Sequence, residues 1–143
     1  MKVKELGHIV LYARGIDRSR HFYRDLLGWD EVGEAFGGRA VAFSSGRTHH
    51  ELLHIEVDED ASPIPTPPRL GLYHFGLKVG ESDAELAEAV RELRSAGVRI
   101  NGMSDHTVTH SVYIEDPDGS GHPWNQGGGH ENCCRIRRKN ATN

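Results

Sequence analysis

An internal repeat is the feature of this 143-residue chain that most limits how it can fold. The segment GHIVLYARGID in the first half resembles the segment YHFGLKVGESD in the second half. When His8 is aligned with His74, Asp17 is also aligned with Asp83, because both pairs are 66 residues apart. Both segments alternate apolar and polar residues, as half-buried strands do. The repeat therefore predicts two copies of one supersecondary unit.

Each copy of the repeat continues with a helical pattern and then with strand-like segments. The spacing of apolar residues predicts helices over about 18–27 and 84–96, each of which ends before a glycine. The strand-like segments are GWDEVGE, GRAVAFSSG and HELLHIEV in the first half, and VRINGMS and HSVYIED in the second. The predicted fold class is therefore α+β, with two βαβββ modules whose curved mixed sheets form a cleft. The fourth strand of the second module is missing from this pattern.

Composition divides the chain into a single domain and an atypical end. The domain is predicted over residues 1–121, with module 1 at about 4–58 and module 2 at about 70–121. A connector at 59–69 separates the modules and holds four of the six prolines. Residues 122–143 contain three consecutive glycines and follow neither a helical nor a strand period, so we expect a disordered tail. A frameshift or a replaced end of the coding sequence would explain this change.

Charge and hydropathy exclude several classes of function. The formal net charge of −4 argues against binding to nucleic acid or to an anionic membrane surface. No apolar run approaches the roughly 18 residues that a membrane span needs, and the charged N-terminus does not resemble a signal peptide. The two cysteines are adjacent, at 133–134, and cannot build a disulfide framework. We therefore expect a soluble, cytoplasmic protein.

The chain contains ten histidines, and the repeat gives two of them a shared position. His8 and His74 both lie on the first predicted strand of a module. If the two sheets face each other, both imidazoles point into one cleft, where they could bind a metal ion. Taken singly, each histidine is more simply explained as a polar residue on a half-buried strand. The metal hypothesis therefore depends on the repeat.

These motifs resemble a known family. The paired units with GHIVLYARGIDRSRHFYRDLLGW, YHFGLKV and DHTVTHSVYIEDPDG resemble the vicinal oxygen chelate superfamily over about residues 4–121. That superfamily includes glyoxalases, fosfomycin and bleomycin resistance proteins, and extradiol ring-cleaving dioxygenases. The placement of the histidines is most similar to single-domain extradiol dioxygenases of the catechol type. Because one fold supports many chemistries, the reaction has to be argued from the site residues.

The resemblance implies a role for five residues. His8 and His74 would bind Fe(II), with Mn(II) or another divalent ion as the alternative metal. His50 would handle protons during the reaction. His106 and Tyr113 would hydrogen-bond the substrate oxygens and help to orient the substrate.

Alternatives remain open at three of these positions. His50 can be explained as a polar residue at the edge of a strand. Tyr113 can be explained as a core aromatic residue whose hydroxyl reaches the rim of the core. His110 lies four residues after His106 and could take its place.

The resemblance also implies a third metal ligand, and here the chain departs from the family. In the superfamily, a carboxylate lies four residues after the glycine of Asp-Pro-Asp-Gly, which is Gly119 here. That position is Pro123, which can neither coordinate a metal nor donate to a sheet. His122 is the nearest replacement, although it would face the other way, and Glu131 is the only carboxylate beyond it. We therefore expect weak or partial metal occupancy.

The predicted function is that of an extradiol dioxygenase-like enzyme, which cleaves a small catechol-type aromatic with Fe(II) and dioxygen in aromatic hydrocarbon catabolism. Loss of the third ligand would impair this activity. The alternative enzyme is a glyoxalase or thiol transferase, which would need Glu51 or Glu56 as a metal ligand. A metal-free binding protein of the same superfamily is the non-enzymatic alternative. Exposed sheet edges predict a homodimer, and no nucleic acid or membrane partner is expected.

Overall fold

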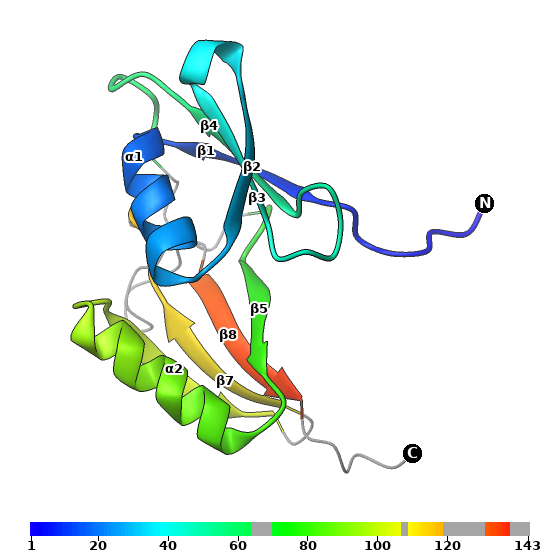
Figure 1. Ribbon diagram of the computed structural model, residues 1–143, viewed down its shortest axis with the longest axis vertical. Helices are drawn as coiled ribbons and strands as arrows, with labels where there is room; N and C mark the ends of the chain where they lie inside the picture. Colours follow the sequence, from blue (N-terminus) through cyan, green and yellow to red (C-terminus); the bar gives the residue numbers. More distant parts are fainter. Residues whose placement is uncertain (64–69, 107–108, 119–130, 138–143) are drawn as a thin grey trace. The chain divides into compact units, whose positions relative to one another are not determined.

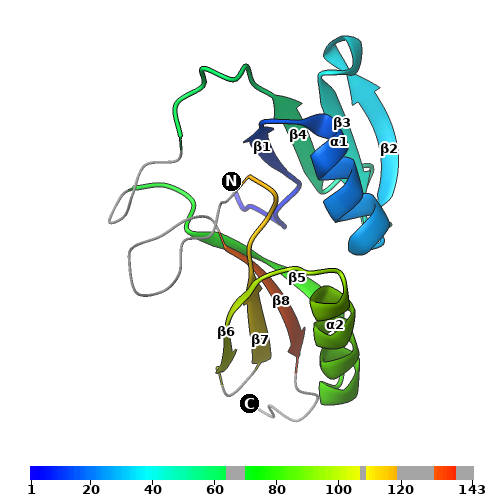
Figure 2. The ribbon, with the colours of Figure 1, turned by 90° about the vertical axis from the view of Figure 1, so that its left-hand side faces the viewer.

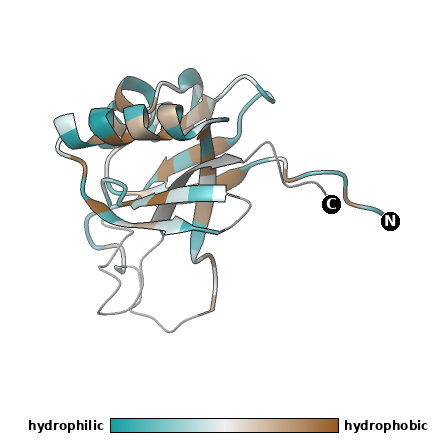
Figure 3. Ribbon diagram, turned by 90° about the horizontal axis from the view of Figure 1, so that it is seen from below, coloured by the Kyte–Doolittle hydropathy of each residue, from teal (hydrophilic) through white to brown (hydrophobic). Residues whose placement is uncertain are grey.

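The computed structural model describes the backbone of residues 131–137 and, with their side chains, residues 1–63, 70–106 and 109–118. The chain divides into two compact units, residues 1–62 and residues 63–143. Each unit contains one four-stranded sheet with a helical segment against it (Figure 1, Figure 2). Hydrophilic and hydrophobic residues alternate along the strands and around the helices, as expected of elements with one buried face (Figure 3). Among the described residues, no helix is long and apolar enough to cross a membrane.

The sheet of the first unit is mixed. Its strands, in the spatial order β1-β4-β3-β2, are β1 (Ile9–Ala13), β2 (Asp30–Ala35), β3 (Ala40–Ser44) and β4 (Leu52–Glu56). β1 runs parallel to β4, with Ile9 opposite Leu52, and the other two pairs are antiparallel. A short 3-10 helix, η2 (Phe36–Gly38), makes the turn from β2 to β3. The parallel pairing places the beginnings of β1 and β4 side by side.

The helical segment of the first unit is formed by α1 (Ile16–Ser19) and the π-helix η1 (Arg20–Leu26). It confirms the first predicted helix, although the sequence does not indicate the π-helical geometry. The Leu27 N–H donates to the Phe22 carbonyl, five residues earlier, at 3.0 Å, and this bond defines the wider turn. Tyr23, on the same turn, is fully buried and packs against Phe43 of β3.

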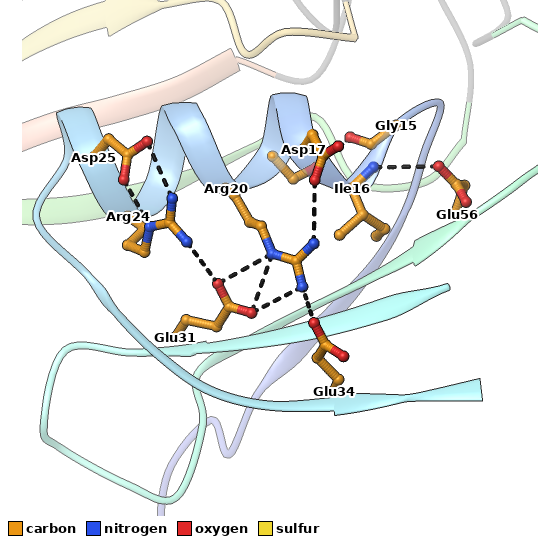
Figure 4. Close-up of polar contacts among 10 residues, drawn as sticks. Gly15, Ile16, Asp17, Arg20, Arg24, Asp25, Glu31, Glu34 and Glu56 are labelled. Atoms are coloured by element: carbon orange, nitrogen blue, oxygen red, sulfur yellow. Dashed lines mark hydrogen bonds and ion pairs between the residues drawn. The ribbon is translucent and has the colours of Figure 1, made fainter. Parts of the chain in front are cut away.

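Charged side chains attach this helical segment to β2 (Figure 4). Arg20 donates from Nε to both oxygens of Glu31 at 3.1 Å, and its Nη2 donates to the same carboxylate at 2.9 Å. Arg24 also reaches Glu31 at 3.1 Å, and Arg20 pairs with Glu34 as well. The Arg20 and Glu31 side chains are only 20% and 19% exposed, so water screens this pair less than an exposed ion pair.

The second unit repeats this arrangement. Its elements are β5 (His74–Gly80), α2 (Asp83–Ser95), β6 (Ile100–Asp105), β7 (Thr109–Ile114) and β8 (Glu131–Arg137). The sheet order is β5-β8-β7-β6, with β5 parallel to β8 and the other pairs antiparallel. Both units therefore have the βαβββ topology, and the predicted α+β class with two modules of mixed sheets is confirmed.

Helix α2 forms where the sequence predicts the second helix, and a side chain caps its N-terminus. The Ser82 hydroxyl oxygen accepts the Glu85 N–H at 3.4 Å, and the hydroxyl donates to the Glu85 carboxylate at 2.6 Å. The apolar stripe of Leu86, Val90 and Leu93 is buried. This stripe explains why the helix lies along one face of its sheet, as Figure 2 shows.

The C-terminal part of the chain corrects one prediction. We expected no fourth strand in the second module, but residues 131–137 form β8 between β5 and β7. The remaining parts of the predicted tail, 122–130 and 138–143, lie outside the described residues. The prediction failed because it relied on the side-chain pattern. A strand between two others is held by backbone hydrogen bonds on both sides, which the pattern does not report.

Candidate functional site

In the first unit, the structure brings His8 and His50 together. His8 immediately precedes β1, and His50 lies just before β4, so the parallel pairing of these strands makes the two residues neighbours. Their ring centroids are 4.7 Å apart, and the ring planes are inclined by 39°. His49 packs edge-on against His50, with centroids 4.3 Å apart. Three imidazoles therefore gather at one end of this sheet.

This gathering affects the protonation of His50. Partial burial lowers its pKa below the usual value, and repulsion from the imidazoles of His49 and His8 lowers it further. An imidazole that is neutral at neutral pH has one ring nitrogen able to accept a proton. His50 can therefore serve as a proton acceptor at this end of the sheet.

In the second unit, the structure brings His74, His106 and Tyr113 together. His74 begins β5 and Tyr113 lies on β7, and their rings meet edge to face with centroids 5.9 Å apart. The Tyr113 hydroxyl lies 2.8 Å from His106 Nε2, a hydrogen bond whose direction depends on the imidazole tautomer. All three residues that the resemblance implies for this module are thus in one cluster.

His110 has different surroundings from His106. Its Nδ1 lies 2.5 Å from Asp83 at the start of α2, and its Nε2 lies 3.4 Å from Asp105 at the end of β6. Strand alternation places His110 and Tyr113 on opposite faces of β7. His106 is therefore the histidine that contacts the Tyr113 hydroxyl, and His110 contacts carboxylates.

The register of the two sheets places a glutamate at equivalent positions in both units. In the first unit, the register of β1 and β4, extended by one residue, puts His8 opposite Glu51. In the second unit, His74 is opposite Glu131, the first residue of β8. The fourth strand of each unit therefore begins near a carboxylate position beside the histidine of the first strand.

Counting along the sequence named Glu131 as the only carboxylate beyond His122 but did not place it opposite His74. The count from Gly119 led to Pro123, and both Pro123 and His122 lie outside the described residues. The count assumed that no residues are inserted between Gly119 and the fourth strand. It therefore did not reach the strand that follows the three glycines. The segment ENCCRIR, at 131–137, does not alternate cleanly between apolar and polar residues, so its pattern contains no clear signal for a strand there.

Glu51 and Glu56, the two candidate ligands of a glyoxalase-type site, are held by other contacts. Glu51 accepts hydrogen bonds from three backbone N–H groups of the β3–β4 loop, and its side chain is only 10% exposed. Burial by itself would raise the pKa of Glu51, but these hydrogen bonds lower it overall. Glu56 accepts the Ile16 N–H at 3.3 Å, at the start of α1. Both carboxylates therefore have structural roles.

The ability of these side chains to coordinate a metal ion depends on their residue type and on their proximity. Among the described side chains, no group of three or more His, Cys, Asp or Glu residues lies close enough to hold a metal ion. The Glu131 side chain is not among those described. Each unit does offer an imidazole at the head of its first strand and a glutamate position opposite. Imidazole and carboxylate are donors that suit Fe(II) and Mn(II), so the residue types fit such an ion.

The chain has two βαβββ modules, and each has a histidine at the start of its first strand. This arrangement defines a protein of the glyoxalase and dioxygenase type. The chain belongs to the Glyoxalase/Bleomycin resistance protein/Dioxygenase superfamily, which matches residues 5–121. It is 32% identical over 116 residues to catechol-2,3-dioxygenase of Bacillus subtilis (strain 168), covering 81% of this chain and 39% of that protein. It is 28% identical over 116 residues to biphenyl-2,3-diol 1,2-dioxygenase 3 of Rhodococcus globerulus, covering 80% of this chain and 59% of that protein.

A solved structure supports the fold assignment. A glyoxalase/dioxygenase from Nostoc punctiforme matches with a TM-score of 0.72 and 20% identity, covering 95% of this chain and 92% of that chain. The family resemblance inferred from the sequence is therefore confirmed. The chain spans less than two thirds of the length of the two curated relatives.

Proposed function

We propose that this protein is an extradiol-type dioxygenase, which binds Fe(II) and cleaves a small catechol-type aromatic compound with dioxygen. One observation carries the proposal. Each unit has a histidine at the head of its first strand with a polar ring beside it, His50 beside His8 and Tyr113 beside His74. The similarity to dioxygenases named for catechol and biphenyl-2,3-diol supports the same reaction.

The residues that would hold the metal are His8, His74 and Glu131. Two imidazoles and one carboxylate form the donor set of Fe(II) oxygenases, and Mn(II) or another divalent ion accepts the same donors. A bound ion of this kind makes catechol hydroxyl groups more acidic and leaves positions for substrate and dioxygen. Glu131 would take the place of the carboxylate that Pro123 cannot supply, and its register position opposite His74 supports this role.

The chain's own side chains would bind and orient the substrate. His50 would accept a proton from a catechol hydroxyl. Tyr113 would donate to a substrate oxygen, because a hydroxyl can donate one hydrogen bond while it accepts another. His106 would hold the Tyr113 hydroxyl in place through their 2.8 Å contact. Restricting the substrate in this way reduces the entropy that has to be lost on reaching the transition state.

A glyoxalase or thiol transferase is the second candidate, since the superfamily includes glyoxalases. The hydrogen bonds of Glu51 and Glu56 count against it, because a metal would have to displace them. A metal-free binding protein would not need paired histidines at equivalent strand positions. We expect the enzyme to work in the cytoplasm, where the adjacent thiols at 133–134 stay reduced.

Reconstitution with Fe(II) without oxygen, followed by metal analysis and dioxygen uptake on catechol, tests the proposal. We expect iron to bind and dioxygen to be consumed as the ring opens. The variants His8→Ala, His74→Ala and Glu131→Gln should each bind less iron. The control His110→Ala should bind as much iron as the unmodified protein. A protein that neither binds iron nor consumes dioxygen with catechol contradicts the proposal.

A further inference from the structure

The loop between β3 and β4 is folded around a single carboxylate. Glu51 Oε2 accepts the Ser45 N–H at 2.9 Å, and Glu51 Oε1 accepts the N–H groups of Arg47 and Thr48, each at 3.1 Å. The Ser45 hydroxyl donates to Oε1 as well, at 3.2 Å. Hydrogen bonds to a charged acceptor are stronger than those to a neutral one. Four of them on a side chain that is only 10% exposed fix Glu51 in one position.

Arg47 connects this loop to the segment that leads into β1. Its Nη2 donates to the carbonyl oxygens of the two residues before His8, each at 3.2 Å. Its Nε lies 3.5 Å from Glu51 Oε1. A planar guanidinium can hold carbonyl and carboxylate groups at the same time in a fixed geometry, which a lysine ammonium cannot reproduce. Arg47 therefore links the backbone directly before His8 to the carboxylate directly after His50.

We propose that Glu51 and Arg47 are positioning residues, a clamp that fixes the separation of the His8 and His50 imidazoles. The two rings touch with centroids 4.7 Å apart. Contacts between two rings are individually weak, so the separation of the rings also depends on the backbone beside each of them. The clamp fixes the backbone beside both. The role of this pair rests on the proposed function, in which His8 binds the metal and His50 accepts a proton.

A purely structural role for the same contacts gives a different expectation. If Glu51 and Arg47 only stabilised the loop, weakening them would lower the free energy of unfolding. The two rings in the molecules that remain folded would keep their separation. If the two residues position the rings, the separation itself changes, and this change is visible in the folded protein without metal or substrate.

The test is the nuclear Overhauser effect between the imidazole protons of His8 and His50, measured on the full-length, metal-free protein. Resonances are assigned by comparison with His8→Gln and His50→Gln. We expect a clear effect in the unmodified protein. A displacement of about 1 Å, the scale at which positioning affects catalysis, weakens it about threefold, because the effect falls with the sixth power of distance. We expect at least this loss in Glu51→Gln and in Arg47→Lys.

Two features of the design keep the outcome interpretable. Arg47→Lys keeps the positive charge and removes only the planar guanidinium. This variant therefore remains informative if Glu51→Gln fails to fold. Glu56→Gln is the matched control, because Glu56 ends β4, the strand that directly follows Glu51, and also accepts a backbone N–H. This control should keep the full effect. An unchanged effect in Arg47→Lys, or its absence from the unmodified protein, overturns the proposal, whatever the protein does with iron or catechol.

Discussion

At the scale of single residues, His54 is a histidine on β4 with a structural role. Its side chain is 2% exposed, and its Nδ1 lies 2.8 Å from the Ser19 hydroxyl. Its ring meets Tyr23 edge to face, with centroids 4.7 Å apart. Burial lowers its pKa to about 4. No hydrogen-bond partner for its Nε2 is present among the described residues, so a proton added there would leave a buried charge unpaired.

This environment predicts that the protein loses stability in mild acid. The pKa of His54 is about 4 when folded and near 6.5 when unfolded, so the unfolded state binds the proton more readily. The contribution of His54 to the free energy of unfolding is complete above pH 6.5, and it is lost as the pH falls from 6.5 towards 4. It amounts to about 3 kcal/mol at most. Urea unfolding from pH 7 to pH 4.5 should show this loss, and His54→Leu should show a shallower dependence. Equal slopes in both proteins would exclude His54 as the cause.

His50 gives a prediction for turnover. Replacing it in His50→Phe removes the proton acceptor and keeps a ring of similar size. We expect iron binding to be retained and turnover of catechol to fall by roughly 10²–10⁴-fold. His49→Phe is the control, since His49 contacts His50 and has no role in the proposed chemistry. Loss of iron from His50→Phe would make His50 a ligand, and an unchanged rate would make it an ordinary surface residue.

At the scale of elements, the sequence predicted the features that neighbouring residues determine. It did not predict the features that depend on contacts between distant residues. α2 was predictable because its cap residue Ser82 and its apolar stripe lie within one short segment of the sequence. The π-helical turn was not, because it depends on how Tyr23 packs against the sheet. The pairing of His8 with His50 was predictable only through the family resemblance. The contacts of Glu51 and Arg47 were not predictable, since most of their partners are backbone groups, which have no sequence signature.

The contact between Arg20 and Glu31 gives a prediction for the stability of the first unit. Arg20→Met keeps most of the aliphatic side chain but removes the guanidinium that joins η1 to β2. We expect the free energy of unfolding to fall by about 1–2 kcal/mol, since Glu31 is left partly buried without this partner. Arg91→Met is the control. Its partner Glu88 lies on the same helix and both side chains are exposed, so the change should stay within about 0.5 kcal/mol.

The position of β8 gives a prediction about truncation. A chain that ends at residue 137 keeps the strand between β5 and β7, whereas a chain that ends at residue 130 leaves both strands without this neighbour. We expect the longer chain to unfold like the full-length protein. The shorter chain should lose hydrogen-exchange protection throughout β5 and β7. Equal protection in the two truncated chains would show that β8 contributes nothing to the sheet.

At the scale of the whole molecule, each sheet ends in two edge strands, β1 and β2 in the first unit and β5 and β6 in the second. Edge strands carry backbone donors and acceptors on one side that no strand of the same sheet pairs with. Several large apolar side chains are also exposed, among them Val32 and Phe36 on or beside β2 and Met103 on β6. Both properties are typical of surfaces that associate with another chain.

We therefore expect a homodimer, because pairing of identical chains is the commonest way to cover such surfaces. Light scattering or sedimentation at micromolar concentrations should give a mass near twice 15.9 kDa. A mass of 15.9 kDa under these conditions would contradict the prediction.

In each module, the fourth strand pairs with the first strand but comes last in the sequence. It can therefore be exchanged without changing the sequence of the elements before it. The histidine, the helix and the first three strands come from one continuous stretch of sequence, and the last strand joins the ladder beside the first. In the second unit, seven residues do so. An acidic residue at the first position of such a segment is enough to put a carboxylate position beside the histidine. Recombination that exchanges this segment could therefore alter the donor groups beside the histidine in one step.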